Sequence, residues 1–154
     1  MITLSIDSSV IKAKLEQLKN IDTKPLMQQI ATDMKNQVDM RFRKCEDPDG
    51  VKWAELSPAT IAQRRNGSSK PLNDTGGTKG SITAYSDETQ AVVGTNKKVD
   101  KAGKVSAAVH NFGAKTGRGR KVTLPQRRFI GFSEKQKTRY EKICRKYFEN
   151  IIKK

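Results

Sequence analysis

Two aspartates in the segment DPDG, Asp47 and Asp49, are the residues of this sequence that most resemble metal ligands. An EF-hand calcium loop has oxygen ligands at its first, third and fifth positions, a glycine at its sixth and a bidentate glutamate at its twelfth. With Gly50 at the sixth position, Cys45 takes the first and Leu56 the twelfth, and neither side chain supplies an oxygen. The segment instead predicts a turn in which Gly50 adopts a positive φ.

Two glycine-rich segments, TGGTKGS at 75–81 and GAKTGRGRK at 113–121, could form loops that bind phosphate. A P-loop requires the pattern G-x-x-x-x-G-K-[ST], because its backbone N–H groups surround the phosphates. Ser81 and Arg118 stand where the second glycine of that pattern should be. We therefore interpret both segments as turns and expect no cofactor.

His110 is the only histidine of the chain, so a two-histidine metal site or proton relay cannot be built. A nucleophilic Cys–His pair would need Cys45 or Cys144 beside His110. Both cysteines fall in segments with the pattern of helices and carry no activating motif. We interpret His110 as a hydrogen-bonded structural residue. No catalytic, metal-binding or cofactor-binding set remains, and the sequence argues against an enzyme.

The elements that position these residues begin with helices. In the longest, apolar residues recur every four positions from Leu26 to Phe42, and Pro25 suits its first turn. Ser57 and Pro58 have the types expected where a short helix begins. The last helix has an apolar face and begins at Ser133 or Glu134. The expected helices cover about 9–19, 23–44, 58–65 and 134 onward.

Between the long helices the sequence changes to β-prone runs. Segments 81–85 and 89–95 predict a hairpin, while 105–113 fits either a short helix or a strand. Together these elements predict an α+β fold in a single domain, 1–154. It would have an N-terminal strand and helices, a central antiparallel β meander or hairpin, and a C-terminal amphipathic helix. The expected strands are 2–6, 81–85, 89–95, 121–125 and 127–132.

Positive charge is the strongest signal in the composition: 31 Lys and Arg against 16 Asp and Glu give +15. Such an excess indicates a polyanionic neighbour such as nucleic acid, although a solvated surface explains it as well. Phe112 is the only aromatic residue within the most basic stretch, so DNA would be met through its phosphates and not by base stacking. That stretch contains Lys97, Lys98, Lys101, Lys104, Lys115, Arg118, Arg120, Lys121, Arg127 and Arg128, with Asp100 as its one acid.

The composition also bounds the surroundings of the protein. No apolar run approaches the roughly 20 residues of a membrane span, and the N-terminus lacks the pattern of a signal peptide. The two cysteines lie far apart in the sequence, which makes a reducing cytoplasm the default expectation. We expect mobile basic loops near 66–80, 96–104 and 114–121, because Gly, Ser, Asn and Lys dominate there.

Trp53, the only tryptophan, follows the DPDG turn directly. Its large apolar ring and single N–H suit it to anchoring an irregular loop on a core. Taken with four later segments, this region resembles the phage virion morphogenesis family of tail-completion proteins. The five signature segments contain Asp47, Pro48, Asp49, Gly50, Trp53, Leu56, Ser57 and Thr60; Leu72, Asp74, Thr75, Gly76, Ser81 and Ile82; Val93, Gly94 and Thr95; Ala107, His110, Phe112 and Gly113; and Pro125, Arg128, Phe129, Gly131 and Ser133.

The resemblance implies a non-enzymatic structural protein that acts late in virion assembly, in tail completion or head–tail joining. Its partners would be other tail or connector proteins, and copies of the chain could form a ring through which DNA passes. It would occupy the host cytoplasm during assembly and then the virion. Under this hypothesis eight basic residues face DNA or an acidic ring partner, without sequence readout: Lys97, Lys98, Lys101, Lys104, Lys115, Arg118, Arg120 and Lys121. The alternative is a sequence-independent nucleic-acid-binding protein, which the charge alone supports.

Overall fold

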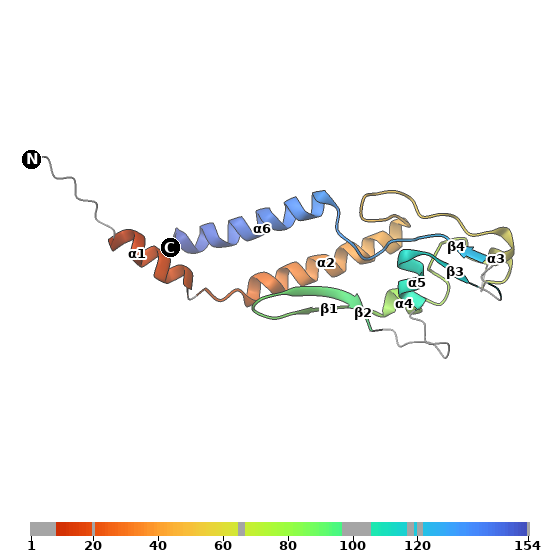
Figure 1. Ribbon diagram of the computed structural model, residues 1–154, viewed down its shortest axis with the longest axis horizontal. Helices are drawn as coiled ribbons and strands as arrows, with labels where there is room; N and C mark the ends of the chain where they lie inside the picture. Colours follow the sequence, from red (N-terminus) through yellow and green to blue (C-terminus); the bar gives the residue numbers. More distant parts are fainter. Residues whose placement is uncertain are drawn as a thin grey trace, which may run out of the picture.

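The computed structural model describes residues 9–19, 21–64, 67–96, 106–116, 119 and 122–153. The molecule is elongated around one long helix, α2 (Lys24–Lys44). A β-hairpin lies along one side of α2 and the C-terminal helix α6 (Glu134–Ile152) along the other (Figure 1). Helix α1 (Ser9–Lys19) lies beyond one end of this layer, near the C-terminus, and the short elements gather at the opposite end. The α+β fold class is confirmed.

Helix α2 has the boundaries and the buried stripe that its sequence predicts. Thr23 precedes it, Pro25 lies in its first turn, and the apolar side chains repeating every four residues are buried. The helix ends at Cys45, which is left-handed with φ of 53° and donates its N–H to the carbonyl of Arg41. The buried apolar side chains are Leu26, Ile30, Ala31, Met34, Val38 and Phe42.

The predicted hairpin is formed by β1 (Ile82–Ser86) and β2 (Ala91–Thr95), which pair antiparallel. The Asp87 carboxylate organises the turn between them, because its Oδ1 accepts hydrogen bonds from the N–H groups of Thr89 at 2.8 Å and Gln90 at 2.9 Å. The Thr23 hydroxyl donates to the carbonyl of Glu88, so the start of α2 is bonded to this turn.

The central β region differs from a single meander. It consists of two separate two-stranded sheets, the hairpin β1–β2 and a second pair, β3 (Ala114–Thr116) with β4 (Val122–Leu124). Strand β4 confirms the expectation at 121–125, whereas β3 lies at the start of a segment predicted as loop.

The expected strand at 127–132 is wrong: this segment is not part of either sheet. Its backbone groups are bonded in other ways. The N–H of Arg127 donates to the carbonyl of His110 at 2.8 Å, and the N–H groups of Phe129 and Ile130 both donate to Oδ1 of Asn111 at 2.9 Å. The amide of Asn111 thus takes the place that a neighbouring strand would have had.

Three short helices complete the end of the molecule opposite α1. Helix α3 (Pro58–Ala62) ends three residues before Arg65, where its end was expected, and Gln63 is its C-cap residue. Helix α4 (Gly77–Gly80) lies within the segment 66–80 that was interpreted as a loop. Helix α5 (Ser106–Phe112) decides the open alternative at 105–113 in favour of a helix. The expected strand at 2–6 and the whole basic segment 97–104 lie outside the described residues.

Helix α6 begins with a complete capping box. The Ser133 hydroxyl accepts from the N–H of Gln136, and the Gln136 side chain accepts from the N–H of Ser133. Near its other end, the Tyr147 hydroxyl donates to the carbonyl of Asp22 at 2.7 Å and so bonds α6 to the segment before α2. No helix in the described part of the chain is long and apolar enough to cross a membrane.

Two apolar clusters stabilise the two ends of α2. The layer cluster joins the first half of α2 to β2 and α6; it contains Leu26, Ile30 and Met34, with Met27, Ala91, Val93, Tyr140, Ile143, Cys144, Tyr147 and Phe148 packed against them. The loop cluster surrounds the second half of α2 mainly with residues from irregular segments, joined by one residue of β1 and one of α5; it contains Val38, Phe42, Trp53, Leu72, Ile82, Ala107 and Phe129.

Candidate functional site: the signature segments and their cleft

The DPDG segment is a turn, as predicted. Oδ1 of Asp47 accepts hydrogen bonds from the N–H groups of Asp49 and Val51, both at 2.9 Å, and the carbonyl of Asp47 accepts from Gly50. Gly50 has φ of +86°, which glycine adopts without strain. The Asp47 carboxylate therefore organises its own backbone, which is the role of an Asx turn and not of a metal ligand.

Arg128 connects this turn to a segment almost eighty residues later. Its guanidinium forms an ion pair with Asp49 and lies 3.6 Å from the Asp47 carboxylate. Beside it, a Cβ at Gly131 would lie 3.4 Å from Pro48, so the two segments are in close contact. The first and last signature segments thus form one structural unit.

Trp53 anchors the unit on the loop cluster. The residue is 5% exposed, and its ring meets that of Phe42 edge to face at 5.6 Å between centroids. Its indole N–H donates to the carbonyl of Arg128 at 3.2 Å. Phe129, which is 1% exposed, also packs against Phe42, with the two ring centroids 5.1 Å apart. The structure confirms Trp53 as an anchor with a satisfied N–H.

Arg127 has a structural role that its position in the basic stretch does not suggest. It is buried, and its guanidinium donates from Nε to the carbonyl of Ala54 at 2.9 Å and from Nη2 to that of Glu55 at 3.0 Å. Burial lowers the pKa of Arg127, and the nearby charge of Arg64 lowers it further. The side chain satisfies the irregular backbone that follows Trp53.

Arg41 and Asn111 provide hydrogen-bond partners for the backbone of the segment around Phe129. From α2, buried Arg41 donates to the carbonyl of Phe129 at 2.7 Å and to Oε1 of Gln136 at 2.6 Å. Desolvation lowers the pKa of Arg41. Buried Asn111 accepts from the N–H of Phe129 at 2.9 Å. Sequence reasoning missed Arg41, Asn111 and Gln136. For Arg41 a signal exists, because it lies three residues after Val38 and beside Phe42 on the apolar stripe.

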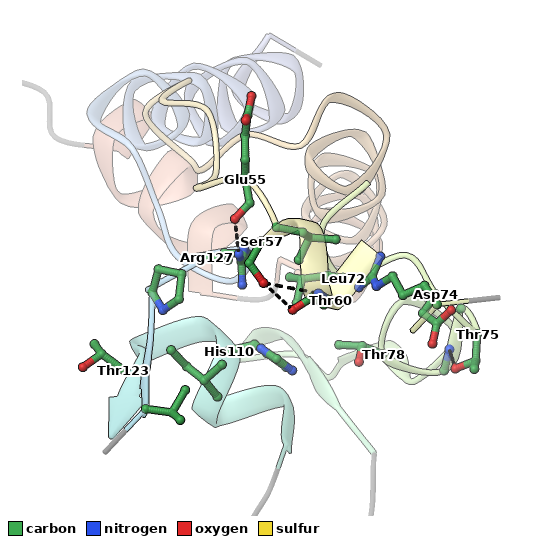
Figure 2. Close-up of a pocket in the computed structure, with 17 residues that line it drawn as sticks. Glu55, Ser57, Thr60, Leu72, Asp74, Thr75, Thr78, His110, Thr123 and Arg127 are labelled. Atoms are coloured by element: carbon green, nitrogen blue, oxygen red, sulfur yellow. Dashed lines mark hydrogen bonds between the residues drawn. The ribbon is translucent and has the colours of Figure 1, made fainter. Parts of the chain in front are cut away.

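Beside this unit the same signature segments line a cleft of about 560 Å³. Figure 2 shows Ser57 and Thr60 on one side of the cleft, and His110 and Thr123 on the other, with Thr75 and Thr78 at one end. The apolar side chains Leu72, Val122 and Leu124 contribute to the lining. Signature residues from four of the five segments meet here: Leu56, Ser57, Thr60, Leu72, Asp74, Thr75, Gly76, His110 and Pro125.

The polar groups of the cleft are suited to hydrogen bonding. The Ser57 hydroxyl lies 2.9 Å from that of Thr60 and accepts from its N–H at 3.3 Å, so Ser57 is a helix cap as predicted. Hydroxyl, imidazole, carboxylate and guanidinium groups together can bind a polar peptide surface. Within the described residues, no group of three or more His, Cys, Asp and Glu could hold a metal ion.

The residues predicted as one structural motif separate into distinct environments. Trp53 and Phe129 are buried in the loop cluster, whereas Phe112 is 73% exposed at the end of α5. Gly113, which follows it, has φ of +73°, and a Cβ there would lie 3.1 Å from the backbone of Leu124 and of Gln126. Of the residues predicted to face DNA, Lys115 is exposed on β3, and the other seven lie outside the described residues.

Comparison with known proteins gives a family match and a similar prophage protein. The model of the phage virion morphogenesis family matches residues 7–149. The chain belongs to the phage virion morphogenesis family. It is also similar to the Mu-like prophage FluMu G protein 2 of Haemophilus influenzae, with 33% identity over 156 residues that cover 99% of this chain and all of that relative. No solved structure matches the chain significantly.

Family membership confirms the resemblance that the signature segments carry. It places the chain among phage and prophage proteins of virion assembly. The buried signature residues form the unit around Trp53, and the partly exposed ones line the cleft. The five segments on which the resemblance rests therefore contribute both to a core and to a surface cleft.

Proposed function

We propose that this protein completes the tail or joins the tail to the head, as a structural component without catalytic activity. The match to the family over residues 7–149 is the observation that carries the proposal. Its partners are other tail or head–tail connector proteins, and copies of the chain assemble into a ring around the path of the DNA. It is present in the host cytoplasm during assembly and at the tail or the head–tail joint of the finished virion.

The cleft beside α3 supports an action through protein contacts. Its lining combines hydroxyl groups with Leu72, Val122 and Leu124, a mixture suited to a partner peptide. Exposed Phe112 offers a large apolar side chain on the same end of the molecule. Aromatic side chains of this kind are enriched in protein interfaces.

Deleting the gene from an inducible phage tests the proposal. We expect induced cells to lyse normally and to contain filled heads and tails that are not joined, which electron microscopy of the lysate would count. Wild-type protein supplied from a plasmid should restore joined particles. Joined, infectious particles in the complete absence of the protein would contradict the proposal.

The basic segments 97–104 and 114–121 belong to the same proposal as surfaces that face DNA or an acidic ring partner. Changing Lys97, Lys98, Lys101 and Lys104 to Gln removes four positive charges from the first segment. We expect a lower phage titre with an unchanged melting temperature. An unchanged titre would rule out this role for the segment 97–104.

The net charge of +15 favours a second candidate, a sequence-independent nucleic-acid-binding protein. A gel shift of the isolated protein with duplex DNA across a range of salt concentrations, taken together with the gene deletion, distinguishes the two. Tight binding that weakens steeply with salt depends on the release of counterions, and it favours the second candidate if particles assemble normally in the deletion.

A further inference from the structure

A row of cations lies along one side of α6, outside the basic segments 97–104 and 114–121. Lys135, Arg139, Lys142 and Lys146 are exposed and separated by four, three and four residues. Residues with this spacing lie on one face of an α-helix. At 1.5 Å per residue the row is about 16 Å long.

The row borders a groove between α6 and α2, which lie side by side (Figure 1). Two adjoining hollows of about 720 and 500 Å³ form this groove, and both are lined by Gln29, Arg139 and Ile143. Lys135, Lys142 and Lys146 line the larger hollow. From α2 the groove receives polar side chains that can donate hydrogen bonds: Gln28, Gln29, Thr32, Asn36 and Gln37.

The members of the row differ in how their charge is balanced. Arg139 forms a two-bond ion pair with Asp33 of α2, at 2.8 and 3.2 Å, and so fixes one point of the groove. Within the residues that the structure describes, Lys135, Lys142 and Lys146 form no ion pair. The three lysine side chains of the groove can therefore pair with an external anion.

We infer that the α2–α6 groove binds the phosphate backbone of duplex DNA. A DNA strand carries a phosphate every 3.4 Å of helix axis, so several phosphates face a row about 16 Å long. Lysine ammonium groups neutralise such phosphates, and amide side chains such as Gln29 and Gln37 donate hydrogen bonds to their oxygens. The inference rests on the second candidate function and assigns its DNA contact to this groove, whereas the assembly role is tested separately by the gene deletion.

The lining favours DNA over an acidic protein partner. A partner helix or peptide needs apolar pockets for its anchoring side chains. Here Ile143 and Pro25 are the apolar side chains that line the hollows. Aromatic side chains are also missing from the lining, so bases would not be stacked and the binding would be independent of sequence.

The test measures binding of the full chain to two unrelated duplexes of about 30 base pairs, by fluorescence anisotropy between about 50 and 200 mM salt. The groove variant carries Lys135→Gln, Lys142→Gln and Lys146→Gln, which keep long helix-forming side chains at exposed positions. We expect both duplexes to bind wild type equally. The variant should bind at least about tenfold more weakly at 100 mM salt. Its slope of log affinity against log salt should be less steep by about 2.7.

A matched variant, with Arg43, Lys70 and Lys79 changed to Gln, removes the same charge from the end of the molecule opposite α1, at cations that also form no ion pair within the described residues. It should keep a slope close to that of the wild type, and circular dichroism should show that both variants are folded. Equal losses in the two variants would overturn the inference, because the binding would then follow net charge alone. Absence of DNA binding by the wild type at about 50 mM salt would also overturn it and leave an acidic protein as the partner of the groove.

Discussion

The two halves of α2 are buried by different means. In the first half, Leu26, Ile30 and Met34 face regular elements, the hairpin on one side and α6 on the other. In the second half, Val38 and Phe42 face three irregular segments that contribute one residue each, Trp53, Leu72 and Phe129, together with Ile82 of β1 and Ala107 of α5. One continuous helix thus supports a layered region and a region built from loops.

The polar contacts show what the irregular region requires. Backbone groups that leave water need hydrogen-bond partners, and loops lack the partners that a helix or sheet provides. Arg41, Arg127 and Asn111 supply them, and all three side chains are buried. At the loop end, buried side chains therefore substitute for secondary structure.

Trp53→Ala should destabilise the protein most, because the ring fills the centre of the loop cluster and its N–H bonds to Arg128. We expect a loss of about 3–5 kcal/mol in the free energy of unfolding, measured by chemical denaturation. A change near zero would mean that the irregular end does not depend on this anchor.

Arg127→Met tests whether a buried guanidinium replaces secondary structure. The change leaves the carbonyls of Ala54 and Glu55 without their donor, and we expect a loss of about 2–4 kcal/mol. The adjacent Arg128→Met is the control, because Arg128 forms its ion pairs at a partly exposed position and should cost less than about 1 kcal/mol. Equal losses of stability in the two variants would contradict the larger structural role assigned to the buried guanidinium of Arg127.

The sequence predicted the regular region well because its signals are local. Apolar spacing and Pro25 identified α2, and the hairpin and the start of α6 followed from strand runs and from Ser133. In the irregular region it predicted the turn at Gly50 and the anchoring by Trp53, since both depend on one residue and its neighbours.

What the sequence did not predict depends on contacts between distant segments. Arg127 was counted only as one cation of the basic stretch, but its partners lie more than seventy residues earlier. The segment 127–132 was predicted as a strand because its composition suits extended chain, while the amide of Asn111 that replaces a partner strand has no periodic signature. The cleft likewise exists only once four separate segments are brought together.

Gly113→Ala should have an intermediate effect. The residue has φ of +73°, and a Cβ would lie 3.1 Å from the backbone at Leu124 and Gln126. We expect a loss of about 1–3 kcal/mol in stability. Gly80→Ala meets no atom within 4 Å and should change stability by less than about 1 kcal/mol. A harmless Gly113→Ala would show that α5 and β4 do not need this close approach.

Asp87→Asn should have the smallest effect and a defined pH dependence. Hydrogen bonds from the side chain of Gln90 and from Thr89 lower the pKa of Asp87 to about 2 from its ordinary 3.8. A lowered folded pKa contributes stability above pH 3.8 that is lost as the pH falls through about 2. The variant should therefore melt below the wild type at pH 7, with the difference disappearing near pH 2. A constant difference in melting temperature between pH 7 and about pH 2 would contradict the lowered pKa of Asp87.

The most direct test of the proposed role is the position of the protein in the virion. Cryo-electron microscopy of purified particles, with the chain fitted into the density, would locate it. We predict a ring of copies around the DNA path at the end of the tail that meets the head. Particles that are complete and infectious without this density, or density at another site such as the tail tip, would contradict the account.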